Sequence, residues 1–295
     1  MLRLLIFIIV TLLFSSIITG CNGQLIEYDG KHDNHRYFVG NKNSTVRDIF
    51  NSTVKVITKA KAITNGGPPN IDDGEYHEHT KSGTGVFITK KHILTVEHVI
   101  AMDTVAYRTP WGVAEVEIVK KKEERTIIYF GEKKYPAKVI FQNKKHDVAL
   151  LEIITEGVDE IDEGVVSSKS FIPVIGNSDE LILGNVLFTV GNGLTGEKNV
   201  RMGIFSGIVA PKDSEEKLDI VLDETFMLSN VMMPGDSGGP IFSIRDGIFE
   251  LIGITQGTMM LYEVMGWGIR INAIKKLIGD AWPKRETAPY WSSLF

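Results

Sequence analysis

Short apolar runs separated by turn residues occupy most of the chain from about position 52 to position 270. Runs rich in Val, Ile, Phe and Thr that are bounded by Gly, Pro, Asn and Asp are typical of β-strands. The pattern therefore predicts an all-β protein. We expect strands in the first half at 54–58, 83–88, 92–95, 104–108, 112–119, 126–130, 137–141 and 147–153, and in the second half at 186–191, 202–210, 218–227, 240–243, 249–255 and 268–271.

A helix is predicted at the C-terminal end of this pattern. Ile271, Ile274, Leu277 and Ile278 recur with the spacing that places side chains on one helical face. Pro283 cannot continue a helix because it lacks the backbone N–H. We therefore expect the helix at 271–282 and a tail at 283–295.

The N-terminal end has a different pattern. An apolar run at 4–13, interrupted only by Thr11, follows the positive charge of Arg3. The run has the length of a signal-peptide core, whereas a membrane-spanning helix needs ~20 apolar residues. Residues 18–21, Ile-Thr-Gly-Cys, resemble the lipobox of bacterial lipoproteins, which are cleaved before the cysteine and carry a diacylglycerol on its sulfur. The resemblance implies a signal peptide at 1–20 and lipidation of Cys21; an uncleaved anchor or an ordinary secretory signal are the alternatives.

The segment at 21–51 is polar and contains glycine, and we expect it to be a flexible tether. Cys21 is the only cysteine, so no intramolecular disulfide can form. The chain is 43% hydrophobic and 23% charged, as in ordinary globular proteins, and its formal net charge is −5. This charge argues against a nucleic-acid partner. The lysines at 120–122 are balanced by Glu123 and Glu124, and we expect a solvated loop there.

The sequence Gly-Asp-Ser-Gly-Gly-Pro at 235–240 is the strongest chemical signal in the chain. A serine hydroxyl becomes a useful nucleophile when a sharp backbone bend projects its oxygen and backbone N–H groups face the developing oxyanion. Glycines permit that bend because they have no Cβ. A tight turn between two strands would explain the glycines equally well. The whole hexapeptide, however, resembles the nucleophile loop of the chymotrypsin-like serine proteases.

This resemblance requires a histidine and then an aspartate upstream of the serine, and both are present. His98 ends the segment Thr-Val-Glu-His at 95–98, and Asp147 opens an apolar run. The resemblance implies that Ser237 is the nucleophile, His98 the general base and Asp147 the carboxylate that orients the base. It also implies that the N–H groups of Gly235 and Ser237 bind the oxyanion.

The family resemblance implies a fold of two six-stranded antiparallel β-barrels followed by the C-terminal helix. The protease domain would span 52–282, with the barrels at about 52–155 and 171–270 and an acidic crossover at 156–169. Segments 83–88, 188–193 and 206–209 are similar to strands of the bacterial HtrA proteases. Too few residues follow Ile278 for the PDZ domain that usually follows in that group, so we expect none.

Asp236 also departs from the HtrA pattern, which usually has Asn before the nucleophile. In trypsin-like zymogens the corresponding Asp pairs with a new N-terminal ammonium after cleavage, and this forms the oxyanion hole. If Cys21 is lipidated, no such ammonium is present. We therefore expect a site that is formed without cleavage, in which Asp236 has another donor; a cleaved form is the alternative.

The resemblance places the floor of the primary substrate pocket at Val231, with walls from Thr255, Gly257 and Gly268. A small shift in alignment would place Met232 or Met233 there instead, and both are also apolar. An uncharged floor disfavours cationic side chains. We expect a preference for small or medium apolar side chains such as Val, Ala, Leu or Met before the cleaved bond.

His77 and His79 lie beside carboxylates in a polar stretch, which we expect to be a solvated loop, but no matching ligand cluster follows them. We therefore expect no metal and no organic cofactor. The predicted function is that of a membrane-tethered, extracytoplasmic serine endopeptidase of the bacterial cell envelope. It would face the periplasm from the outer membrane or lie at the cell surface, with protein or peptide substrates. A catalytically silent binding lipoprotein and an esterase that uses the same three residues are the alternatives.

Overall fold

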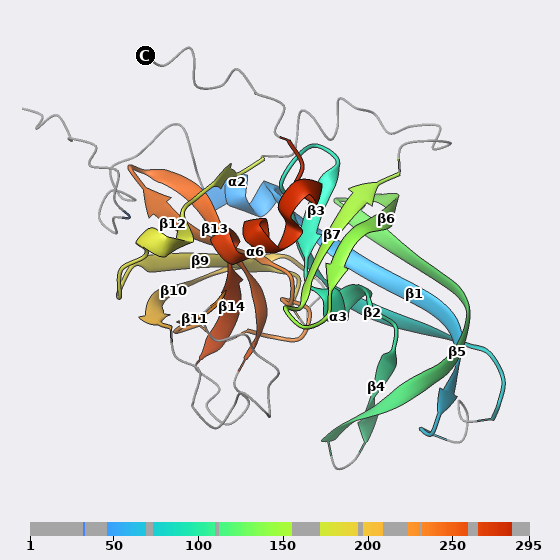
Figure 1. Ribbon diagram of the computed structural model, residues 1–295. Helices are drawn as coiled ribbons and strands as arrows, with labels where there is room; N and C mark the ends of the chain where they lie inside the picture. The colour runs from blue at the N-terminus through green and yellow to red at the C-terminus, as the bar shows by residue number, and fades with distance from the viewer. Residues whose placement is uncertain are drawn as a thin grey trace, which may run out of the picture. The chain divides into compact units, whose positions relative to one another are not determined.

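The computed structural model is drawn in Figure 1. The chain divides into two compact units, Met1–Lys31 and His32–Phe295, and the second carries every feature below. No helix among the described residues is long and apolar enough to cross a membrane. The predicted signal peptide, Cys21 and the predicted crossover at 156–169 lie outside the described residues. The described residues are 32, 46–68, 73–109, 112–154, 172–193, 197–208, 224–230, 232–258 and 265–284.

The first half of the second unit forms a closed antiparallel barrel. Six strands pair in the order β1-β2-β3-β7-β6-β5, and β5 pairs again with β1 to close the sheet on itself. Closure leaves no free edge in the barrel. The strands are β1 (Thr53–Asn65), β2 (His77–Phe87), β3 (His92–Thr95), β5 (Gly112–Phe130), β6 (Lys133–Asn143) and β7 (Val148–Ile153).

The second half repeats this arrangement. Six strands pair antiparallel in the order β12-β9-β10-β11-β14-β13, and β12 closes onto β13. A short strand, β8 (Val174–Ile175), adds a parallel pairing to β13 outside the closed barrel. The strands are β9 (Val186–Gly191), β10 (Asn199–Gly207), β11 (Thr225–Leu228), β12 (Pro240–Arg245), β13 (Ile248–Thr258) and β14 (Gly266–Arg270).

Short helices lie at the connections. They are α2 (Val46–Asn51), α3 (Glu97–Ile100), the 3-10 turn η2 (Ser178–Glu180), α6 (Ile271–Ile278) and the 3-10 turn η4 (Gly279–Ala281). Helix α6 buries Ile271, Ile274 and Ile278, as its spacing predicts. The α-helix ends earlier than expected because Gly279, with φ 54° and ψ −123°, takes a non-helical conformation of positive φ that glycine adopts readily.

One buried apolar cluster runs through the first barrel, α6 and part of the second barrel. It contains Val54 and Leu150 from the first barrel, Phe188 and Ile254 from the second, and Ile274 from α6. The two barrels and the helix therefore share a core. The predicted all-β fold of two six-stranded antiparallel barrels with a C-terminal helix is confirmed.

The expected loop at 120–124 is wrong. These residues belong to β5, which continues without a break for 19 residues. Strand β1 extends beside it, and Lys61 pairs with Glu123 across the ladder. The backbone bonds are thus satisfied by the neighbouring strand while the charged side chains stay exposed. Beyond this point β5 pairs with β4 (Thr104–Thr109), and the ribbon extends away from the barrel (Figure 1).

The expectation of a solvated loop also fails at His79, which lies on β2 and is only 4% exposed. Its Nδ1 is 3.2 Å from the Tyr107 hydroxyl, and burial lowers the pKa of the imidazole. His77 instead contacts Asp73 at 2.8 Å near the surface. No group of three His, Cys, Asp or Glu side chains suited to a metal ion occurs among the described residues.

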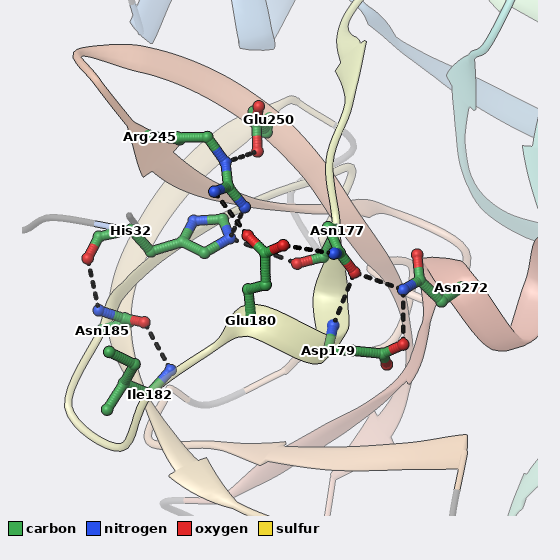
Figure 2. Close-up of polar contacts among 9 residues, drawn as sticks. All are labelled: His32, Asn177, Asp179, Glu180, Ile182, Asn185, Arg245, Glu250 and Asn272. Atoms are coloured by element: carbon green, nitrogen blue, oxygen red, sulfur yellow. Dashed lines mark hydrogen bonds and ion pairs between the residues drawn. The ribbon is translucent and has the colours of Figure 1, made fainter. Parts of the chain in front are cut away.

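Part of the segment expected to be a tether belongs to the folded unit. Residues 46–51 form α2, whose Ile49 is fully buried. His32 is buried against the second barrel, where its Nε2 lies 3.1 Å from Arg245 Nη2 (Figure 2). Asn185 Nδ2 donates to the His32 carbonyl at 3.3 Å. The rest of 21–51 lies outside the described residues.

Candidate active site

His98 lies on the exposed face of α3, directly after β3. Its neighbours Glu97 and Val99 are buried, whereas 46% of the His98 side chain is exposed. The His98 N–H donates to Asp147 Oδ1 at 2.9 Å, and His98 Nδ1 lies 2.8 Å from Asp147 Oδ2. An ionised carboxylate only accepts hydrogen bonds, so Nδ1 carries the hydrogen and Nε2 presents its lone pair. The imidazole is therefore oriented as a base.

Asp147 is placed by the turn between β6 and β7. Asn143 Oδ1 accepts the His146 N–H at 3.0 Å, and the Asp147 N–H donates to the Lys144 carbonyl at 3.2 Å. Asp147 has φ 50°, a left-handed conformation that Asp adopts more readily than most residues. Such a conformation costs free energy and is found preferentially at functional sites. The turn brings both carboxylate oxygens to His98.

The loop that contains Ser237 is fixed between the two barrels. The Ser237 carbonyl accepts the Thr84 N–H of β2 at 2.8 Å, and the Gly238 N–H donates to the Thr255 carbonyl of β13 at 2.8 Å. A Cβ on Gly238 would overlap the Thr84 carbonyl, so only glycine fits. On β2, a Cβ on Gly83 would overlap Val99 and lie 2.8 Å from the Ser237 carbonyl. The serine loop and α3 therefore meet at the same point of β2.

The Ser237 hydroxyl faces the second barrel in this conformation. Its Oγ lies 3.5 Å from the Gln256 carbonyl, and Gln256 Nε2 donates to the His146 carbonyl at 2.8 Å. The structure describes both Ser237 and His98, and no hydrogen bond joins their side chains. His98 and Asp147 are thus brought into contact, whereas Ser237 is brought beside α3 without bonding to His98.

The residues before Ser237 form a tight turn. The Asp236 N–H donates to the Met233 carbonyl at 2.9 Å, Pro234 occupies the second position, and Gly235 has φ 101°. Proline followed by a residue of positive φ is the signature of a type II turn. The Thr84 hydroxyl donates to the Gly235 carbonyl at 2.6 Å and fixes the orientation of the next peptide.

Two backbone donors in this loop remain available. The N–H groups of Asp236, Gly238 and Gly239 donate to carbonyls of the chain. Within the described part of the chain, the N–H groups of Gly235 and Ser237 donate to no acceptor. Such a pair of donors beside a serine is what an oxyanion requires.

Asp236 is buried, with 2% of its side chain exposed, and contacts a residue that sequence reasoning did not identify. Arg201 of β10 donates from Nη1 to Asp236 Oδ2, and the Met233 N–H donates to the same oxygen at 2.7 Å. Burial raises the pKa of the Asp236 carboxyl, while these two donors oppose that rise. The expected alternative donor to Asp236 is therefore an arginine side chain.

The residues predicted to form the substrate pocket are placed only in part. Val231 lies outside the described residues. Thr255 is 1% exposed, and its hydroxyl donates to the Asp236 carbonyl at 2.6 Å. A Cβ on Gly257 would lie 2.7 Å from the Trp267 ring, and one on Gly268 would lie 2.5 Å from Ile241. Thr255 thus contacts the serine loop, whereas Gly257 and Gly268 pack closely against other residues of the second barrel. The role of all these residues in selecting substrates stays a prediction.

Two closed six-stranded barrels with a serine loop between them define the class of the chymotrypsin-like serine proteases. The trypsin-like peptidase domain matches residues 83–254, which is more than half of the chain and includes His98, Asp147 and Ser237. The chain belongs to this family. No curated protein matches it.

Solved structures support the same fold at low sequence identity. The HtrA-type protease AlgW with a decapeptide matches with a TM-score of 0.53 and 17% identity, over 79% of this chain and 65% of AlgW. AlgW with a tripeptide matches with the same TM-score and identity, over 79% of this chain and 60% of AlgW. The chain thus spans less than two thirds of the length of these proteases, and the likeness concerns the fold.

Proposed function

We propose that the protein is a serine endopeptidase in which Ser237 is the nucleophile, His98 the general base and Asp147 the orienting carboxylate. The observation that carries this proposal is the double contact of Asp147 with His98, which leaves Nε2 as the basic nitrogen on the exposed face of α3. The serine loop is held against the strand on which α3 packs. A serine beside an oriented imidazole is the arrangement required for acyl transfer.

In the proposed reaction Ser237 Oγ attacks the scissile carbonyl carbon while His98 Nε2 removes the hydroxyl proton. The carbonyl oxygen becomes an oxyanion, which the Gly235 and Ser237 N–H groups bind. The imidazolium gives its proton to the leaving amine as the C–N bond breaks. Water, deprotonated by the same nitrogen, then releases the acyl group. The attack requires the hydroxyl to turn from Gln256 toward His98, and a 3.5 Å contact restrains it weakly.

Substitution of the nucleophile tests the reaction. Ser237→Ala should lower kcat on the order of 10⁶-fold, because the base has no hydroxyl to activate. Ser206→Ala is the matched control, since that hydroxyl makes one local contact at the surface and should keep full activity. Assays on paired peptide and ester substrates distinguish a peptidase from an esterase. Residual activity of Ser237→Ala within about tenfold of the wild type would show that the nucleophile is misassigned.

The proposed substrates are peptides, and AlgW has been solved with peptides in its structure. The expected apolar preference before the cleaved bond follows from Val231, Thr255, Gly257 and Gly268 and is measured with a peptide library. Cleavage mainly after Arg, Lys or Glu would reject this pocket and leave the three catalytic residues untouched. No metal or organic cofactor takes part in the proposed steps.

The proposed location is the bacterial cell envelope, with a lipid on Cys21 as the anchor. Several acyl chains on one cysteine hold a protein stably on a membrane, whereas one chain does so only marginally. Cys21→Ser should abolish labelling by radioactive palmitate and either release the protein from the membrane fraction or leave an uncleaved precursor. Unchanged fractionation of the variant together with an unlabelled wild type would reject the lipid anchor.

A further inference from the structure

A buried carboxylate immediately precedes the proposed nucleophile. Asp236 Oδ1 accepts no hydrogen bond from a described residue, whereas Oδ2 accepts two, from Arg201 Nη1 and from the Met233 N–H. A buried carboxylate without a cation would be strongly unfavourable. Among the described residues, Arg201 is the side chain that supplies the positive charge.

Two glycines at and just after the end of β9 leave space for this ion pair. A Cβ on Gly191 would overlap the Asp236 carboxylate. A Cβ on Gly193 would lie 3.1 Å from Arg201 Nη2 and 3.3 Å from Asp236 Oδ1. Gly191 ends β9, the strand next to β10, and Gly193 follows two residues later, so the absence of side chains at both positions is what lets Arg201 reach Asp236.

The ion pair lies at one end of the turn that presents the oxyanion donors. Asp236 is the last residue of the turn that begins at Met233, and its carboxylate also accepts the Met233 N–H. Met233 and Asp236, the first and last residues of the turn, are therefore joined by the Asp236 side chain as well as by the backbone. From the opposite side, Thr84 fixes the Gly235 carbonyl. With both restraints in place, the Gly235 and Ser237 N–H groups have defined directions.

We propose that Arg201 is a positioning residue that supplies from within the folded chain the cation required by Asp236, so that the oxyanion donors are in place without cleavage of the chain. This inference rests on the proposed function, because it concerns the same site. It assigns to a strand side chain the role that a new N-terminal ammonium has in zymogens. Arg201 acts through Asp236 and the turn, so its loss should affect the chemical step more than substrate binding.

Three variants of the full-length chain test this role. Arg201→Met removes the charge at similar length, Arg201→Lys restores a cation, and Arg201→Met with Asp236→Asn removes the unpaired charge. Arg201→Met should lower kcat by about 10²–10³-fold, as loss of an oxyanion donor does, with KM changed by less than about threefold. Its melting temperature should fall by about 5–10 °C. Arg201→Lys and the double variant should each recover most of both losses.

Arg270→Met is the matched control. Its side chain is 21% exposed, as is that of Arg201, and it pairs with Asp179 away from the serine loop. We expect wild-type kcat from this control. A kcat of Arg201→Met within about threefold of the wild type, or a double variant no better than the single one, would overturn the positioning role.

The absence of a cleavage requirement is measured on wild-type protein labelled with a fluorophosphonate, which reacts with an activated serine. Mass spectrometry should find the same N-terminus in labelled and unlabelled chains. A label confined to chains with a new, shorter N-terminus would overturn the inference. If the wild type neither turns over peptides nor takes the label, the proposed function fails, and the melting temperatures of the three variants still decide whether Arg201 pairs with Asp236.

Discussion

The two halves of the candidate site are held in different ways. His98 and Asp147, both from the first barrel, meet near the surface, with 46% and 24% of their side chains exposed. Asp236, which precedes Ser237 in the second half of the chain, is 2% exposed and pairs with Arg201 in the interior. Exposed ion pairs contribute little to folding stability, whereas loss of one partner of a buried pair leaves an uncompensated charge. Loss of the first pair should therefore lower the reaction rate alone, whereas loss of the second should lower both the rate and the stability of the fold.

Asp147→Asn should separate rate from stability most clearly. The amide can donate to Nδ1 and stabilise the wrong imidazole tautomer, so kcat should fall by about 10⁴-fold. The melting temperature should stay near that of the wild type, because the pair is partly exposed. Asp103→Asn, which removes a carboxylate from another exposed ion pair of the same barrel, is the control. A large loss of stability in Asp147→Asn would erase the contrast between the two pairs.

Thr84 links the halves, and its hydroxyl should matter for both fold and rate. It donates to the Gly235 carbonyl and accepts the Asn192 N–H at 2.9 Å while fully buried. Thr84→Val leaves these groups unpaired and should lower kcat by about 10–100-fold and stability by about 1–3 kcal/mol. Thr84→Ser should restore both.

Thr58→Val is the matched control for Thr84→Val. Thr58 is also fully buried, and its hydroxyl contacts Thr126 at 3.2 Å within the first barrel. Thr58→Val should lower the stability of the protein without changing kcat. If Thr58→Val and Thr84→Val lower the rate equally, Thr84 has no specific part in forming the turn.

Substitution of Glu97 should give the smallest effect, a change of melting temperature that depends on pH. Glu97 is 7% exposed, and its pKa is raised, first by burial and second by the negative charge of Asp147. A raised pKa means that the folded chain binds the proton more tightly than the unfolded chain, so stability falls as the pH rises above the ordinary value of 4.5. Glu97→Gln should therefore raise the melting temperature at pH 7 and have no such effect below about pH 4. An equal effect at both pH values would contradict this charge-based explanation.

The sequence predicted the fold through its strand pattern, and it predicted the contact between His98 and Asp147 through the resemblance of their segments to the chymotrypsin-like proteases. Strands β3 and β9 have the expected bounds, since short apolar runs between turn residues define them. Arg201 carried no such signal. It is one arginine on an alternating strand, and its partner lies 35 residues away in the chain. The pairing of Arg201 with Asp236 is recognised only in the structure, where Gly191 and Gly193 leave space for both side chains.

The errors at β5 and His79 have a common physical cause. Charged or polar residues such as Glu123 suggest solvent exposure but do not say whether the backbone is paired. In the structure β1 satisfies the backbone of β5 through a ladder that runs from Lys55 to Asn65. His79 is buried, and the Tyr107 hydroxyl, from the neighbouring ribbon, lies 3.2 Å from its Nδ1. Such contacts depend on how far a strand extends, which composition does not determine.

The position of a fluorophosphonate adduct tests the central claim most directly. The reagent forms a covalent bond with the oxygen of an activated serine, and peptide mass spectrometry locates that bond. We predict a single adduct on Ser237 in the wild type and none in His98→Ala, because the hydroxyl reacts only when the imidazole takes its proton. An unlabelled wild type, an adduct on another serine, or equal labelling of His98→Ala would contradict the assignment of Ser237 and His98 as nucleophile and base.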